Sequence, residues 1–175
     1  KEIFKKYGTS GMFYAHASVG TLHVRPVLNM KSDKDIENMR SISEEAFEMV
    51  KDYKGSHSGE HGDGIVRSEF HEMMFGKKIT NAFEEIKDTF DNKNLLNPGK
   101  IVRPFKSNDR SLMRYKSGYQ AENISTHYDW SNWGQFSDAV EMCNNNGACR
   151  KLDSGVMCPS YRVTKEEKDL VRGRA

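Results

Sequence analysis

The pattern of hydrophobic and polar positions predicts two strands followed by two long helices. Residues 11–16 (GMFYAH) are aromatic and strand-like, and residues 21–28 (TLHVRPVL) alternate with a period of two. Apolar side chains recur at helical spacing over residues 34–53 and over about residues 77–90, and we expect both stripes to form the core. This order predicts an α+β fold, in which helices pack on one face of an antiparallel sheet.

The short break between the two strands sets the expected strand pairing. A tight turn centred between Val19 and Gly20 would place His16 directly opposite His23. Cross-strand partners in an antiparallel pair have Cβ atoms roughly 5 Å apart. Two imidazoles at that spacing can bind the same metal ion, so the hairpin predicts half of a metal site.

The regular pattern is lost between about residues 103 and 135. Ser, Asn, Arg, Tyr and Trp dominate there, which indicates an extended arm or linker that contacts the domain through aromatic side chains: Tyr115, Tyr119, Trp130 and Trp133. A short cysteine-containing segment follows the arm, and residues 164–172 predict the start of a helix with Thr164 as its cap. We therefore divide the chain into a domain (1–105), an arm (106–135) and a tail (136–175).

Composition and charge exclude several classes of protein. The chain has 175 residues, 30% of them charged, with a formal net charge of +2 and both signs mixed along it. This argues against a nucleic-acid-binding protein that depends on bulk positive charge. No apolar run reaches the ~20 residues that span a bilayer, and no secretory signal is visible. Because the first residue is not Met, we interpret the chain as a fragment of a longer protein.

Residues 58–64 (SGEHGDG) combine an acid and a histidine with flanking glycines. Glu60 can bind a metal ion, and His61 can transfer a proton near neutral pH. Glu60 with His16 and His23 makes a set of two histidines and one carboxylate, which leaves coordination positions open for substrate oxygens. Each of the three residues alone is equally consistent with an ordinary strand or loop side chain. Because neighbouring loop residues tend to point apart, we expect His61 to act as a general base and not as a ligand.

Two arginines are candidates for binding a substrate carboxylate. Arg25 shares a strand face with His23, which favours bidentate binding of a carboxylate beside the metal. Arg67 follows the glycine-rich loop, and its position fits substrate binding and a surface cation equally well.

The three cysteines, Cys143, Cys149 and Cys158, all lie near the end of the chain. An odd, local group indicates metal or iron–sulfur ligands in a reducing compartment and not a disulfide framework. Cys158-Pro159 is typical of the end of bacterial ferredoxin-type runs, although Asn146 stands where the second cysteine of such a run would be. Free thiols and a small zinc site are the alternatives.

Together, His16-x6-His23, residues 59–64 (GEHGDG) and residues 97–100 (NPGK) resemble the C-terminal part of FAD-linked oxidases. These are flavoproteins of the vanillyl-alcohol-oxidase type, in the branch of D-lactate, glycolate and D-2-hydroxyglutarate dehydrogenases. The tail resembles the start of the iron–sulfur domain fused to large bacterial members, through three short segments: 139–143 (AVEMC), 157–161 (MCPSY) and 172–175 (RGRA).

The resemblance implies a role for most of the candidate residues. His16, His23 and Glu60 match the ligands of a divalent metal (Zn, Mn or Fe), and His61 matches the histidine that takes the hydroxyl proton. Asn97 and Lys100 would lie near the flavin edge. The chain departs from the family in the hairpin, where the usual His-x-Gly-Asp-Gly-Asn-x-His is replaced by HASVGTLH at residues 16–23.

The implied protein is an FAD-dependent oxidoreductase that oxidises a small 2-hydroxycarboxylate. Most of the FAD would be bound by a domain N-terminal to Lys1, and a 4Fe-4S cluster of the full-length protein would carry electrons to an acceptor. We expect a cytoplasmic protein, with association at the inner membrane and a homo-oligomeric state left open. The alternatives are a non-catalytic, metal-stabilised assembly module and a metal-dependent hydrolase.

Overall fold

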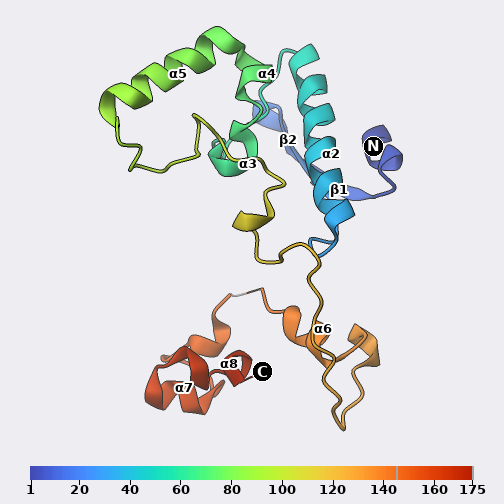
Figure 1. Ribbon diagram of the computed structural model, residues 1–175. Helices are drawn as coiled ribbons and strands as arrows, with labels where there is room; N and C mark the ends of the chain where they lie inside the picture. The colour runs from blue at the N-terminus through green and yellow to red at the C-terminus, as the bar shows by residue number, and fades with distance from the viewer. Residues whose placement is uncertain (145, 175) are drawn as a thin grey trace. The chain divides into compact units, whose positions relative to one another are not determined.

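The computed structural model describes residues 1–144 and 146–174. Asn145 in the cysteine segment and Ala175 at the end of the RGRA motif lie outside the described residues. The chain divides into two compact units, Lys1–Tyr119 and Gln120–Ala175, which Figure 1 colours from blue to yellow and from orange to red. Among the described residues, no helix is both long and apolar enough to cross a membrane.

The sheet of the first unit is a single antiparallel hairpin formed by β1 (Gly11–His16) and β2 (Thr21–Pro26). His23 pairs with Tyr14 and His16 pairs with Thr21, so the expected direct pairing of the two histidines is wrong. A 3-10 turn (Ala17–Val19), ended by Gly20 at φ +67°, joins the strands and shifts the register. Gly20 permits this turn because a residue without Cβ adopts positive φ at little cost.

Helices supply most of the remaining regular structure of the first unit, together with a 3-10 turn at Arg110–Leu112, and confirm the α+β class. The helices are α1 (Glu2–Lys6), α2 (Asp33–Asp52), α3 (Gly64–Ser68), α4 (His71–Phe75) and α5 (Lys77–Phe90). The two long helices therefore lie where the apolar pattern predicts them. Ser32 begins α2 by accepting a hydrogen bond from the Asp35 amide, the usual role of a serine N-cap. Helix α2 contacts α1 and α4, and α4 contacts α5 (Figure 1).

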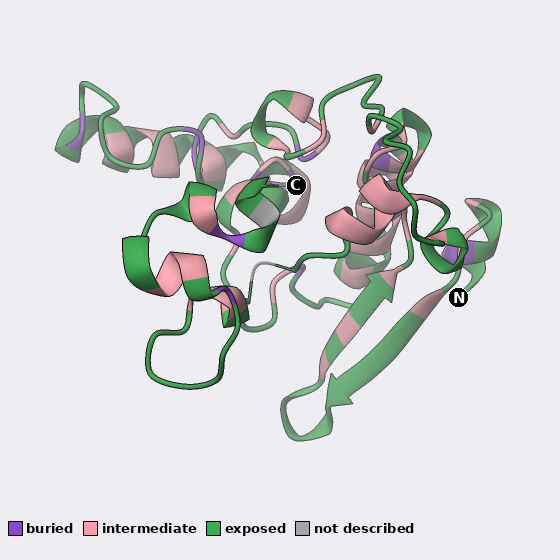
Figure 2. Ribbon diagram, turned by 90° about the horizontal axis from the view of Figure 1, so that it is seen from below, coloured by how far each residue is buried: buried purple, intermediate pink, exposed green. Residues whose placement is uncertain are grey.

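The core of this unit is small. Ile36 and Ile42 of α2 are buried, and Phe4 of α1 stacks on Phe13 of β1 with ring centroids 5.3 Å apart. Figure 2 shows that most of the hairpin is exposed. The expectation of a buried stripe is wrong for α5, where Phe90 is 85% exposed, because the main packing partner of α5 is the five-residue helix α4.

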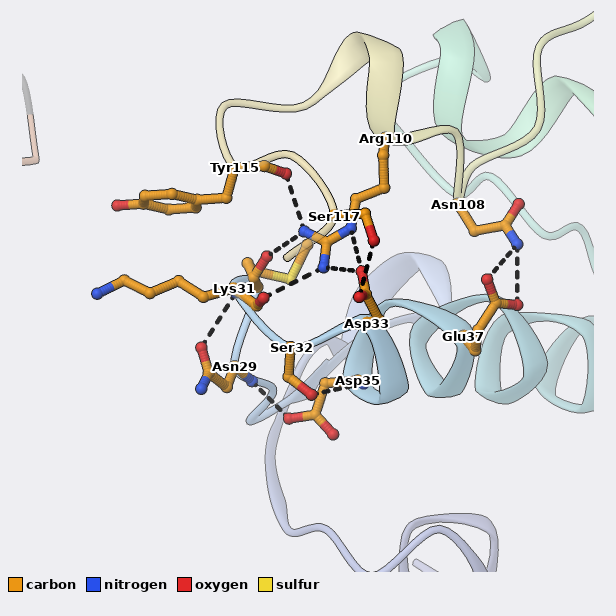
Figure 3. A network of polar contacts seen from close by, with 11 residues as sticks. Asn29, Lys31, Ser32, Asp33, Asp35, Glu37, Asn108, Arg110, Tyr115 and Ser117 are labelled. Atoms are coloured by element: carbon orange, nitrogen blue, oxygen red, sulfur yellow. Dashed lines mark hydrogen bonds and ion pairs between the residues drawn. The ribbon is translucent and has the colours of Figure 1, made fainter. Parts of the chain in front are cut away.

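The chain after residue 103 packs on the start of α2 without forming a long helix. Arg110 is the centre of this contact (Figure 3): its guanidinium donates to the Asp33 carboxylate and to the backbone carbonyls of Met30, Lys31 and Tyr115. The ring centroids of Tyr115 and Tyr119 lie 4.8 Å apart, and Lys31 lies over both rings. Of the four aromatic residues expected to contact the domain, Tyr115 and Tyr119 do so, whereas Trp130 and Trp133 belong to the second unit, where Trp130 packs on Phe136.

The second unit consists of short helices. They are α6 (Phe136–Glu141), α7 (Pro159–Thr164) and α8 (Val171–Arg174), with 3-10 turns at Ser131–Trp133, Ala148–Arg150 and Glu167–Asp169. The helix predicted to start at Thr164 is wrong, because Thr164 ends α7 and Lys165 adopts φ +60°. Pro159 begins the helix earlier, since its fixed φ suits the first helical position.

Candidate active site

A close approach of the glycine-rich loop to β2 forms the site. A Cβ atom built on Gly59 would lie 2.7 Å from Cγ2 and 2.9 Å from Oγ1 of Thr21, which is closer than packed atoms allow. Glycine at position 59 therefore lets the loop lie directly on the strand. Because Glu60 follows Gly59, its carboxylate is brought over the face of the hairpin that carries His23.

The structure brings His16, His23 and Glu60 together. The Nε2 atom of His23 lies 2.7 Å from Oε1 of Glu60, and Nε2 of His16 lies 3.4 Å from Oε2. The ring centroids of the two histidines are 5.0 Å apart although the residues are not direct cross-strand partners. They meet because both project from the same face of the hairpin, one diagonal step apart.

The chemistry of these three residues fits a divalent metal ion. One ligand atom from each lies within 4.8 Å of the others, as in sites that share one ion. The Nε2 atom of His23 is buried and has no hydrogen-bond partner of acceptable geometry, although Glu60 lies close to it. A short contact without hydrogen-bond geometry is what two ligands of one ion present to each other. The arrangement can therefore hold an ion such as Zn²⁺, with positions left for substrate oxygens.

The side chain of His61 also lies beside the Glu60 carboxylate. Its Nε2 lies 3.0 Å from Oε1 of Glu60, and its ring centroid lies 6.1 Å from that of His23. The expectation that it would point away from Glu60 is therefore wrong, because the two side chains are in contact. Its side chain is 69% exposed, so the imidazole is accessible to a substrate bound beside Glu60.

The two arginines take different positions. Arg25 is exposed on β2, two residues after His23 and therefore on the same strand face. Arg67 lies in α3, and its Nη1 donates to the backbone carbonyl of Gly62 at 3.2 Å. Arg67 thus contacts the backbone of the site loop itself.

The remaining candidates lie outside the cluster around Glu60. Lys100 donates to the side-chain carbonyl of Asn97 at 3.4 Å on an exposed turn, where Asn97 has φ +48°. In the second unit Cys143 is exposed, Cys149 is half-buried and Cys158 is buried. Among the described residues, neither of the two groups able to hold a metal ion includes a cysteine.

Sequence reasoning missed a second group of possible ligands, which consists of His57, Asp63 and His71. Nε2 of His71 lies 2.8 Å from Oδ2 of Asp63, and Nε2 of His57 lies 3.7 Å from Oδ1. Burial lowers the pKa of His57 below its ordinary value, against weaker opposing effects of Asp63 and the Arg67 backbone. The sequence does show a histidine on each side of the glycine-rich loop. It gives no indication that His71 lies beside Asp63.

An open hollow lies between the two groups. Its volume is about 340 Å³, and it is lined by residues of the loop and of α4: Ser56, Ser58, Gly59, Glu60, Gly62, Asp63 and Phe75. Glu60 belongs to one group of ligands and Asp63 to the other. The same loop therefore supplies one carboxylate to each group, and both carboxylates line the hollow.

Comparison with known proteins identifies relatives among dehydrogenases of 2-hydroxyacids. The chain is 36% identical to a D-2-hydroxyglutarate dehydrogenase of Pseudomonas putida over 176 residues, which cover all of this chain and 17% of the relative. It is 37% identical to a D-2-hydroxyglutarate dehydrogenase of Haemophilus influenzae over 168 residues, 94% of this chain and 16% of the relative. A D-lactate dehydrogenase of Archaeoglobus fulgidus is 33% identical over 102 residues, 58% of this chain and 22% of the relative.

The chain thus spans about a sixth of the length of the first two relatives. No solved structure matches it significantly. Residues 1–101, which include both hairpin histidines and the whole glycine-rich loop, match the family described as FAD linked oxidases, C-terminal domain. The chain therefore belongs to the family of FAD-linked oxidase C-terminal domains.

Proposed function

We propose that this chain is the substrate-binding part of an FAD-dependent dehydrogenase that oxidises a D-2-hydroxyacid. The observation that carries the proposal is the convergence of His16, His23 and Glu60, with His61 beside them. The D-2-hydroxyglutarate dehydrogenases of Pseudomonas putida and Haemophilus influenzae each match more than nine-tenths of the chain, whereas the D-lactate dehydrogenase matches 58%. D-2-hydroxyglutarate is therefore the substrate that we favour over lactate and glycolate.

His16, His23 and Glu60 would hold a divalent metal ion. When bound, the ion supplies Lewis-acid polarisation of the substrate hydroxyl, and FAD supplies the two-electron acceptor. We propose that FAD is bound chiefly by parts of the full-length protein outside this chain, because the chain spans about a sixth of its relatives. Asn97 and Lys100, which contact each other on an exposed turn, are proposed to lie at the edge of the flavin.

His61 is proposed as the general base. Its exposed imidazole accepts the proton of the substrate hydroxyl while the hydrogen at Cα leaves as hydride, so a 2-hydroxyacid becomes a 2-oxoacid. Contact with the Glu60 carboxylate orients the ring and stabilises the imidazolium that forms. The proton and the hydride leave the same molecule, which accounts for the two electrons and two hydrogens of the oxidation.

Arg25 is proposed to bind a carboxylate of the substrate. It is exposed on the strand face that carries His23, and a guanidinium fork binds a carboxylate bidentately. Arg67 is a weaker candidate, because it already donates to the Gly62 carbonyl. We propose that its main contribution is to support the loop.

The cysteine tail is proposed to belong to an iron–sulfur centre that carries electrons from the flavin. The similarity to the Pseudomonas putida dehydrogenase covers all of this chain and so includes the tail. Further cysteines of the full-length protein would complete the ligands, because a cluster needs four. Iron and acid-labile sulfide in the full-length protein, compared between wild type and Cys158→Ser, test this part separately.

Anaerobic reduction of the flavin in the full-length protein tests the activity. D-2-hydroxyglutarate should bleach the flavin absorbance, and the L-enantiomer is the matched control. His61→Asn should slow bleaching by about 100- to 10,000-fold, the usual contribution of a general base, with flavin and metal content unchanged. An unchanged rate in that variant would remove His61 from the mechanism. Failure of every D-2-hydroxyacid to bleach the flavin would favour the hydrolase or the assembly module.

A further inference from the structure

His57, Asp63 and His71 meet within the first unit, where both histidines are buried and Asp63 is half-buried. Their ligand atoms lie within 4.8 Å of one another. His57 comes from the segment before the glycine-rich loop, Asp63 from the loop itself and His71 from α4. Each imidazole faces a different oxygen of the same carboxylate, at 3.7 Å for His57 and 2.8 Å for His71.

The hydrogen bonds of His71 leave the short contact of its Nε2 atom with Asp63 unexplained. Its Nδ1 lies 3.2 Å from the carbonyl oxygen of Ile101, and a carbonyl can only accept, so Nδ1 carries a hydrogen. In the neutral ring Nε2 is then an acceptor, yet it lies 2.8 Å from Oδ2 of Asp63, which is also an acceptor. Either a second proton or a metal cation must stand between these two atoms.

His57 distinguishes these two explanations. Its side chain is fully buried, and neither ring nitrogen has a hydrogen-bond partner of good geometry, although the Arg67 backbone lies close to the ring. The Oδ1 atom of Asp63 that faces it is also buried without a partner. A proton on His71 would satisfy Oδ2 of Asp63 and leave Oδ1 of Asp63 and at least one nitrogen of His57 unsatisfied. A cation among the three residues would bind Nε2 of both histidines and the carboxylate together, so it accounts for more of the unsatisfied polar atoms.

We propose that His57, Asp63 and His71 form a second divalent-metal site, distinct from the one at His16, His23 and Glu60. Two imidazoles and one carboxylate suit a first-row transition ion of the zinc or cobalt type. The Nδ1 hydrogen bond of His71 to a backbone carbonyl is the outer contact that typically orients a metal-binding histidine.

The surroundings of this site indicate a structural role. Aromatic rings enclose both imidazoles: Phe47 and Phe75 pack against His57, and Phe75 and Phe83 pack against His71. These rings shield the two imidazoles from water, while Asp63 borders the open hollow, through which an ion could enter. Since Asp63 lies in the loop of Glu60 and His61, the ion would fasten that loop to α4 and so hold the catalytic residues in place.

Metal binding to the full-length protein tests the second site. The His16→Ala/His23→Ala double variant alters only the hairpin. After its metal is removed with a chelator, this variant should still bind one equivalent of Co²⁺. Adding His57→Phe to the double variant should abolish that binding. Phe is chosen because it fits the aromatic shell, and circular dichroism should confirm an unchanged fold. The cobalt spectrum should lack the sulfur-to-metal charge-transfer band that cysteine ligands would produce. His127→Gln, at an exposed histidine of the second unit, is the matched control and should leave the equivalent bound.

Two results would overturn the second site. One is that the double variant binds no cobalt except through cysteine ligands. The other is that the double variant still binds one equivalent of cobalt after either His57→Phe or His71→Gln is added. Failure of the proposed dehydrogenase is separable from either result, because it would leave both metal equivalents bound while D-2-hydroxyacids fail to reduce the flavin.

Discussion

The Nε2 atom of His23 lies 2.7 Å from Oε1 of Glu60, although the whole of α2 separates the two residues in the sequence. Tyr14, the cross-strand partner of His23, stacks on its imidazole with ring centroids 4.4 Å apart. The stacked ring limits rotation of the imidazole out of its plane. His23 is therefore held in place by its strand partner, whereas His16, 52% exposed, is not stacked in this way.

The fixed position of His23 beside Glu60 predicts the effect of removing its imidazole. In the full-length protein, His23→Ala should weaken divalent-metal binding by more than the ~10–100-fold typical of changes outside the ligand shell, because a ligand itself is lost. Leu22→Ala, at the neighbouring residue on the opposite face of β2, is the matched control and should leave the affinity unchanged. Competition with a chromophoric chelator measures both. Equal affinities in the two variants would exclude His23 from the ligand set.

Much of the fold follows from local patterns in the sequence. The stripe of α2 and its Ser32 cap are short-range features, and the structure has this helix within one residue of the predicted bounds. The register of the hairpin was not predicted correctly, because it depends on the conformation of residues 17–20, where a 3-10 turn replaces a two-residue turn. The histidines nevertheless meet, since diagonal positions on one strand face are also neighbours.

The candidate site is partly predictable for the same reason. His16, His23 and Glu60 stand in motifs whose spacing can be read along the chain, so their meeting was expected. The meeting of Asp63 with His71 and of His71 with the Ile101 carbonyl depends on how the loop, α4 and the following segment pack. No local periodicity encodes such packing, and the second group became visible only in the structure.

The contact between Gly59 and Thr21 predicts a specific double-mutant effect. Gly59→Ala should destabilise the site loop by about 1–3 kcal/mol, because the new methyl group would overlap the Thr21 side chain. Thr21→Ala removes both overlapping atoms and should restore most of the loss in the double variant. Amide hydrogen exchange of residues 56–64 in the full-length protein measures the effect. Strictly additive changes would mean that the two residues do not interact.

The role of Arg110 predicts that lysine cannot replace it. Its guanidinium contacts the Asp33 carboxylate and three backbone carbonyls at once, and lysine lacks this planar set of donors (Figure 3). Hydrogen bonds from Ser117 and Arg110 also lower the pKa of the Asp33 carboxyl. Arg110→Lys should increase amide exchange over residues 108–117. Arg114→Lys, at a residue whose guanidinium lies over the Tyr115 ring, is the control and should change exchange much less.

Asp91 predicts an acid-dependent change in local stability just after α5. Its carboxylate accepts hydrogen bonds from the Lys87 side chain and from the Leu95 and Leu96 amides, and together these lower its pKa from 3.8 to about 2. Because the pKa is lower in the folded state, the carboxylate stabilises the fold fully above about pH 4, and this contribution is lost as the pH falls towards 2. Asp91→Asn should therefore speed amide exchange at Leu95 and Leu96 near pH 6, and the difference from wild type should shrink between pH 4 and 2. Glu85→Gln on an exposed position of α5 is the control, and a difference from wild type that is the same at every pH would contradict the assigned role of the Asp91 charge.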